Sequence, residues 1–156
     1  MGGLNFFNKK SKLLKEEELD DFTKEMHGEA IYLIKKIEKE YTGLDFSIKS
    51  LSVIENFLEQ TSKFYNKIGK DQLEAITNKT GCYILEVARQ NFGGKYYWYD
   101  KLNQPILVTG QPEFEMSLLA VEKVKARLKN GIENNIVFFF EGYINGVKDK
   151  KSQMIV

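Results

Sequence analysis

Apolar residues in the first part of the chain recur at steps of three or four, the spacing that gathers side chains on one face of an α-helix. The first such stripe predicts a helix from about Lys15 to Tyr41. Thr42-Gly43 ends it, because glycine readily adopts the left-handed conformation that closes helices. The stripe consists of Leu19, Phe22, Met26, Ala30, Leu33, Ile37 and Tyr41.

A second helix is predicted over residues 48–66, with Ser47 as a suitable N-cap. Its apolar residues form two stripes on nearly opposite sides. One stripe is Leu51, Ile54, Leu58 and Tyr65, and the other is Val53, Phe57 and Phe64. Two stripes indicate either burial on both faces or one face that contacts a partner. Because large exposed apolar patches are unusual on monomers, burial on both faces is the favoured interpretation.

A third helix is predicted from about Asp71 to Asn91, ended by Gly93-Gly94. Its main face comprises Leu73, Ile76, Thr80, Ile84 and Val87, while Cys82 and Leu85 lie on the other side. Apolar residues on both sides predict that this helix is central to the domain.

The pattern changes after the two glycines. Residues 95–99 are rich in aromatic side chains and residues 105–109 in β-branched and apolar ones, and both compositions favour strands. Asp100–Gln104 has the composition of a turn, so the three segments together predict a β-hairpin. Glu113–Met116 alternates between polar and apolar residues and is expected to add a third strand at the edge.

Helical spacing returns with Leu118, Val121, Val124 and Leu128 and stops at Asn130-Gly131. The next apolar run, Ile136–Phe140, is continuous, so its periodicity does not decide between helix and strand. Asn134 or Asn135 could cap a helix there, whereas Asn145-Gly146 could turn a hairpin. A helix is the favoured interpretation.

These elements predict a mainly helical α+β protein. Three N-terminal helices precede a short antiparallel hairpin or three-stranded sheet near residues 95–116, and one or two C-terminal helices follow it. Residues 15–147 are expected to form a single globular domain. Residues 1–14 are expected to be a flexible N-terminal segment and the polar residues 148–156 a flexible tail.

Composition narrows the class of protein. The 156 residues include 23 basic and 22 acidic ones, so the basic excess typical of nucleic-acid-binding proteins is missing and no nucleic-acid partner is expected. Cys82 is the only cysteine, which excludes an intramolecular disulfide and a cysteine zinc site. No apolar stretch approaches the roughly 20 residues that span a bilayer. A soluble cytoplasmic protein is expected.

Few residues suggest catalysis. His27, the one histidine, borders the first stripe and is interpreted as a surface or boundary residue. Cys82 lies in mid-helix, where no helix N-terminus would stabilise a thiolate, so a small buried thiol is expected. The glycines match neither the phosphate-binding nor the dinucleotide-binding pattern. No metal site and no cofactor are predicted.

Glu86 is the most notable polar residue, because it lies on the central helix three residues before Arg89, an ion-pairing distance. Two interpretations remain open: Glu86 ties the helix to the hairpin, or it is an acid or base in a pocket where Arg89 or Arg127 binds an anion. The tie is favoured, since a carboxylate beside an arginine stays ionised. Arg127 is interpreted as a second structural tie.

Surplus aromatic residues mark a candidate binding surface. Tyr96–Tyr99 place aromatic side chains on both faces of a strand, which is typical of core packing with a tyrosine-lined rim or of a protein interface. With the charged residues discussed above, the candidate binding residues are Phe57, Phe64, Glu86, Arg89, Tyr97, Trp98 and Arg127.

Several short motifs carry a resemblance over roughly Leu44 to Tyr143. They are Leu44-Asp45-Phe46-Ser47 with Ser50-Leu51 and Leu58, Gly81-Cys82-Tyr83-Ile84-Leu85-Glu86-Val87, Asn91-Phe92-Gly93-Gly94 with Trp98, Pro105, and Arg127-Leu128-Lys129-Asn130-Gly131. In these the chain resembles a group of small bacterial domains, some of them similar to immunity proteins that neutralise a partner toxin. The group often has Gly-Glu-Val where this chain has Leu85-Glu86-Val87. The resemblance implies helices, then a hairpin, then helices, and it implies no catalytic residues.

Three functions follow from these observations. The first is protein binding, either to a partner such as a toxin or by self-association. The second is a small hydrolase-like or ligand-binding enzyme that uses Glu86 with Arg89 or Arg127. The third is an accessory protein at a membrane surface, which Leu4, Phe6, Phe7 and the lysines after them would contact.

Overall fold

The computed structural model describes residues 19–156, and these residues form an α+β fold, as predicted. Five α-helices are present in this range: α2 (Asp21–Ile37), α3 (Leu51–Ser62), α4 (Lys70–Phe92), α5 (Val121–Asn130) and α6 (Ile136–Lys148). The four strands are β1 (Lys95–Tyr99), β2 (Gln104–Thr109), β3 (Met116–Leu118) and β4 (Gln153–Ile155). The helix α2 is shorter than the predicted 15–41, because Asp20 is its N-cap and it ends at Ile37. The segment 1–14 and the residues expected to contact a membrane lie outside the described range.

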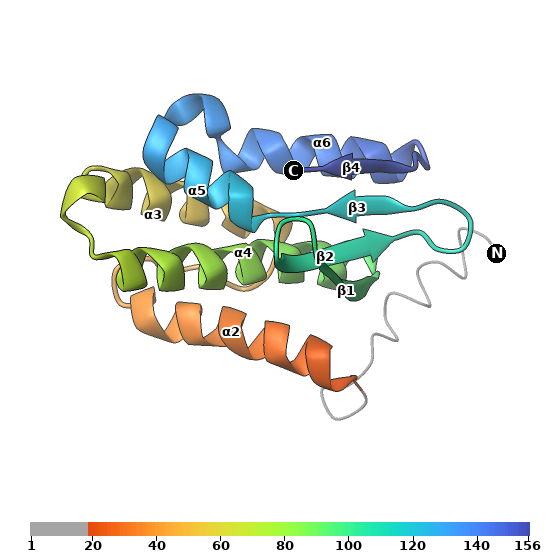
Figure 1. Cartoon of the computed structure of the whole chain (residues 1–156), viewed down its shortest axis with the longest axis horizontal. Helices are drawn as coiled ribbons and strands as arrows, with labels where there is room; N and C mark the ends of the chain where they lie inside the picture. The colour runs from red at the N-terminus through yellow and green to blue at the C-terminus, as the bar shows by residue number, and fades with distance from the viewer. Residues whose placement is uncertain (1–18) are drawn as a thin grey trace.

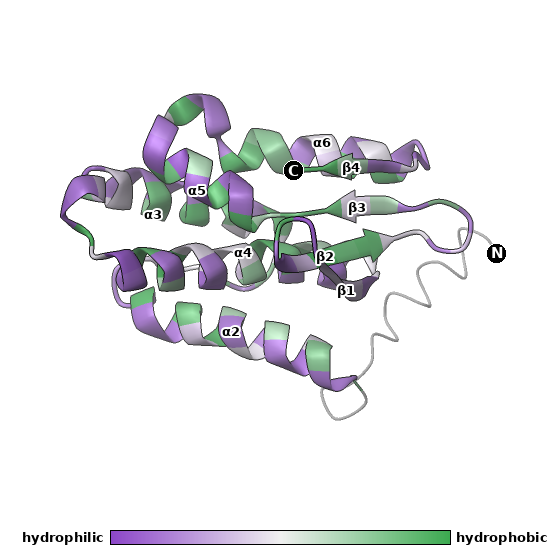
Figure 2. Ribbon diagram, viewed as in Figure 1, coloured by the Kyte–Doolittle hydropathy of each residue, from purple (hydrophilic) through white to green (hydrophobic). Residues whose placement is uncertain are grey.

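The helix α4 is the centre of the fold. Every residue from Thr80 to Arg89 is buried, because α2 and α5 pack against this helix and β2 contacts it as well. In Figure 1 the strands lie side by side from β4, next to α6, to β1, next to α2. Figure 2 shows β2 as a strongly hydrophobic strand. The prediction of a central third helix is therefore confirmed.

Local sequence explains where the helices begin and end. Asp20 caps α2 by accepting a hydrogen bond from the Thr23 amide, and Ser47 caps a 3-10 turn, η2 (Ile48–Ser50), that leads into α3. Gly93 closes α4 with a φ of 77°. The helix α3 is shorter than the predicted 48–66. It ends at Ser62, and a second 3-10 segment, η3 (Tyr65–Lys67), follows before α4.

The sheet contains the predicted hairpin and one strand more than expected. Strands β1 and β2 pair in antiparallel register with Tyr97 opposite Ile106, and β3 continues the antiparallel order beside β2. The prediction of a strand at 113–116 was wrong in position. Glu113 and Phe114 donate their amides to the Gly110 carbonyl, so their alternation belongs to a turn. The strand β3 begins at Met116 and includes Leu118, which was assigned to the next helix.

Part of the segment 148–156, which was expected to be a flexible tail, forms a strand. Strand β4 pairs in parallel with β3, which makes β3 an internal strand rather than an edge. The Leu119 amide donates to the Ile155 carbonyl at 2.9 Å, and the Gln153 amide to the Glu115 carbonyl at 3.1 Å. The strand escaped prediction because it has only three residues and follows the polar residues 148–152.

The last apolar run forms the helix α6, as predicted. The Asn135 side chain accepts a hydrogen bond from the Phe138 amide at 3.0 Å and so caps the helix at its first turn. Residues 145 and 146 lie within α6, so they make no hairpin turn.

Gly81 allows α5 to approach α4 closely. A Cβ atom at this position would lie 2.6 Å from Cγ2 and 3.2 Å from Cα of Val121, the first residue of α5. We expect Gly81→Ala to lower the free energy of unfolding by about 1–2 kcal/mol, since overpacking outweighs the gain in helix propensity. Urea denaturation followed by circular dichroism measures this change.

Gly142 provides the matched control for that substitution. It lies in α6, and a Cβ atom there would meet nothing within 4 Å. Gly142→Ala is expected to raise the free energy of unfolding by about 0.5–1 kcal/mol. Equal effects of the two substitutions would contradict the close contact at Gly81.

Candidate functional site

Glu86 is the centre of a buried polar group that joins three elements. Its side chain is fully buried on α4 and accepts hydrogen bonds from Arg89 Nε at 2.6 Å and Nη2 at 3.0 Å. The Tyr96 hydroxyl of β1 donates to Oε2 at 2.8 Å, and Nδ1 of His27 on α2 lies 2.7 Å from Oε1. Gln90 Nε2 adds a longer contact of 3.3 Å. We call these five residues the Glu86 cluster.

Electrostatics keep Glu86 ionised. Burial raises the pKa of the carboxyl, but the hydrogen bonds and positive charge of Arg89, with the contacts from His27 and Tyr96, lower it further than burial raises it. Burial and the negative charge of Glu86 raise the pKa of Tyr96 well above its ordinary value, so the phenol stays protonated and donates. Glu86 therefore ties the helix to the hairpin, and also to α2.

The partnership between His27 and Glu86 is absent from the sequence interpretation. His27 does lie at the boundary, with 22% of its side chain exposed, and its ring stacks on Phe46 at 5.5 Å between centroids. The two residues are 59 positions apart, so no local pattern could pair them.

Arg127 lies in a separate polar group and does not join Glu86 and Arg89. Its Nε donates to Glu55 Oε2 at 2.6 Å, and the other oxygen of Glu55 accepts the Ile136 amide at 2.9 Å. Arg127 is almost fully buried. This arrangement ties α3, α5 and α6 together, and Glu55 is a residue that the sequence interpretation missed.

Cys82 is a buried thiol, as expected, with Sγ 3.7 Å from the sulfur of Met26. Burial raises the pKa of Cys82 to about 12, and the nearby negative charges of Glu29 and Glu86 act in the same direction. The thiolate that nucleophilic chemistry requires is therefore suppressed.

The candidate aromatic residues differ in exposure. Phe57 is buried and packs edge-on against Tyr41, with 5.3 Å between ring centroids. Phe64 follows the end of α3 and is 58% exposed. The predicted burial of both faces of the second helix is therefore correct at Phe57 and wrong at Phe64.

The hairpin carries three exposed apolar side chains, which we call the hairpin surface. Tyr97 is 39% exposed, Trp98 49% and Leu102 41%. The Trp98 ring lies 6.4 Å from Phe22 on α2, centroid to centroid. The Tyr97 hydroxyl donates to Gln111 Oε1 at 3.2 Å. Because neighbouring residues of a strand point to opposite faces, Tyr97 and Trp98 flank the edge of the sheet.

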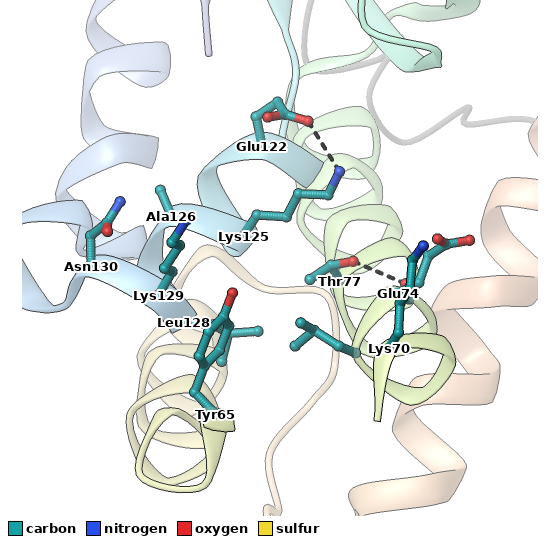
Figure 3. Close-up of a pocket in the computed structure, with 11 residues that line it drawn as sticks. Tyr65, Lys70, Glu74, Thr77, Glu122, Lys125, Ala126, Leu128, Lys129 and Asn130 are labelled. Atoms are coloured by element: carbon teal, nitrogen blue, oxygen red, sulfur yellow. Dashed lines mark hydrogen bonds and ion pairs between the residues drawn. The ribbon is translucent and has the colours of Figure 1, made fainter. Parts of the chain in front are cut away.

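A cleft of about 440 Å³ lies between α4 and α5, which we call the α4–α5 cleft. Figure 3 shows Tyr65 with its hydroxyl pointing into the space between the two helices, and Lys125 extending toward Glu122. Lys70 and Lys129 also line it. The sequence interpretation selected none of these residues, because lysines on amphipathic helices are typical of a solvated face.

Comparison of the chain with models of protein families, with curated proteins and with solved structures found no match. The likeness to small bacterial domains therefore stays a prediction. Within residues 19–156, no group of three or more histidine, cysteine, aspartate or glutamate side chains could hold a metal ion. None of the described helices is both long and apolar enough to cross a membrane.

Proposed function

We propose that this protein acts by binding a protein partner through the hairpin surface, in the manner of an immunity protein that neutralises a toxin. The observation that carries the proposal is the exposure of Tyr97, Trp98 and Leu102 together on one hairpin. Tyrosine and tryptophan are enriched at protein interfaces and, with arginine, among the residues that dominate binding energy.

The position of the hairpin supports the proposal. Strand β1 ends the strand order, so its outer side pairs with no strand in the described part of the chain. The Trp98 ring lies beside Phe22 of α2, and a side chain packed against its own protein loses less entropy on binding than a free one.

The Glu86 cluster gives the enzymatic alternative little support. Both carboxylate oxygens of Glu86 already accept hydrogen bonds, and Arg89 forms a bidentate pair with them. A cleft of about 330 Å³ lies beside Arg89 and Gly94, but Glu86 does not line it. Glu86 therefore acts as a structural residue in this proposal.

Site-specific crosslinking tests the proposal. A photoreactive phenylalanine derivative replaces Tyr97 in the full chain, in cells of the organism that encodes it, and mass spectrometry identifies the adducts. We expect adducts with a single partner protein at this position. We also expect that partner to inhibit growth when expressed alone, and coexpression of the protein described here to relieve the inhibition. Trp98→Ala is expected to weaken binding by about 2 kcal/mol, about thirtyfold.

Tyr32 is the matched control because it is a tyrosine on α2 that is 55% exposed and lies outside the hairpin surface. The same photoreactive group at position 32 is expected to give no adduct with that partner. The proposal fails if positions 32 and 97 give the same adducts, or if Trp98→Ala leaves the affinity unchanged.

A further inference from the structure

The helices α4 and α5 separate on one side of their closest contact. At Gly81 they touch, since Val121 occupies the space of a missing Cβ. Earlier turns of α4, at Thr77 and Lys70, and later turns of α5, at Lys125 and Lys129, border the α4–α5 cleft. Its volume of about 440 Å³ falls in the range of small-molecule pockets, roughly 300–1,000 Å³.

The cleft combines apolar walls with a polar group that has no partner. Leu73, Ala126 and Leu128 supply apolar side chains. The Thr77 hydroxyl is already engaged, because it donates to the Glu74 carbonyl at 2.9 Å. The Tyr65 hydroxyl, in contrast, has no hydrogen-bond partner among residues 19–156 and points into the cleft, as Figure 3 shows.

The charges at the rim favour an anion. Lys125 is neutralised by Glu122 at 3.4 Å, and Glu122 also accepts from Gln104 Nε2 at 3.1 Å. Lys70 and Lys129 have no carboxylate within ion-pair distance in the described part of the chain.

One further acid and two helix ends also contribute to the charge around the cleft. Glu74 is the single acidic lining residue that forms no described ion pair, so two unpaired lysines face one unpaired carboxylate. The first turn of α4, at Lys70, adds the partial positive charge of a helix N-terminus that no side chain caps, and the last turn of α5 adds the partial negative charge of a helix C-terminus. The unpaired lysines therefore carry the preference for an anion.

We propose that the α4–α5 cleft binds a small organic anion, a carboxylate carried on a short apolar body. The apolar part contacts Leu73, Ala126 and Leu128. The carboxylate accepts the Tyr65 hydroxyl and lies near the ammonium groups of Lys70 and Lys129. This site is separate from the hairpin surface, so it does not depend on the protein-binding proposal.

Titration of the isotope-labelled full chain tests the site by NMR. Hexanoate is the probe, and hexanol and hexylammonium have the same body with a neutral or a positive head. We expect hexanoate to give saturable shifts centred on the amides of Thr77 and Ala126, hexanol to bind more weakly, and hexylammonium to give none. Lys70→Glu combined with Lys129→Glu is expected to weaken hexanoate binding about tenfold. Tyr65→Phe is expected to weaken it about threefold.

Lys36→Glu combined with Lys101→Glu is the matched control, since both lysines are exposed and neither lines the cleft. This control carries the same change in net charge and is expected to leave hexanoate affinity unchanged. The proposal is overturned if hexylammonium binds as well as hexanoate, if shifts scatter over the surface or do not saturate, or if the two double variants behave alike. Circular dichroism melts verify that each variant is folded.

Discussion

Glu86→Gln is expected to lower the free energy of unfolding by about 3–5 kcal/mol, because removing one partner of a buried ion pair leaves the other charge uncompensated. Arg89 is buried, and both of its described hydrogen bonds go to Glu86. An amide of the same shape cannot supply the charge that offsets the desolvation of the guanidinium. Urea denaturation followed by fluorescence of Trp98 and by circular dichroism measures the loss.

Glu74→Gln is the control, since Glu74 lies on the same helix, is exposed and forms no described ion pair. A change within about 0.5 kcal/mol is expected there. If Glu86→Gln cost no more than Glu74→Gln, the Glu86 cluster would not be a stabilising feature.

The same carboxylate makes stability depend on acidity. Burial raises the pKa of Glu86, yet its partners, Arg89 first, lower it overall. The folded pKa therefore lies below the unfolded value of about 4.3. The contribution is complete above that value and is lost as the pH falls through the folded pKa. Over this acidic range, the free energy of unfolding is expected to fall less steeply in Glu86→Gln than in the parent.

Glu55→Ala is expected to lower the free energy of unfolding by about 3 kcal/mol. The substitution leaves the buried Arg127 guanidinium without its carboxylate and the Ile136 amide without its acceptor. Because these groups belong to α5 and α6, the loss of protection in hydrogen exchange should be greatest where those helices meet α3.

Glu59→Ala lies one turn further along α3 at an exposed position and serves as the comparison. It removes the same side chain without uncovering a buried charge, so a change of no more than about 0.5 kcal/mol is expected. Equal denaturation midpoints and slopes for the two variants would show that Glu55 is not a structural tie.

The sequence predicted the helices well because amphipathic spacing is a local property. The stripe containing Met26 and Leu33 is buried in α2, and the two-sided pattern of the third helix corresponds to the central α4. Capping was equally local, as Ser47 shows. The third strand was predicted but placed too early in the chain, and β4 escaped prediction because it is short and is fixed by backbone pairing with β3, a segment distant in sequence.

Only some contacts of the two buried polar groups, those around Glu86 and Arg127, could be predicted from the sequence. Arg89 is three residues from Glu86, so helix geometry pairs them, and the hairpin that follows suggested a tie. His27 and Glu55 reach their partners across 59 and 72 positions, and no periodicity encodes such contacts. The α4–α5 cleft could not be predicted for a related reason. It depends on how the two helices diverge in space, and the apolar pattern of either helix alone carries no information about that.

The Glu86 cluster has a consequence for the order of folding. Its members come from α2, α4 and β1; β1 follows α4 directly, whereas His27 on α2 lies 59 positions from Glu86. A partly folded state that buries Glu86 before the other segments dock would carry an undercompensated charge, and such states are costly. Intermediates that contain only some of these elements are therefore disfavoured. We therefore expect the cluster to couple the docking of α2 onto α4 to the docking of the hairpin.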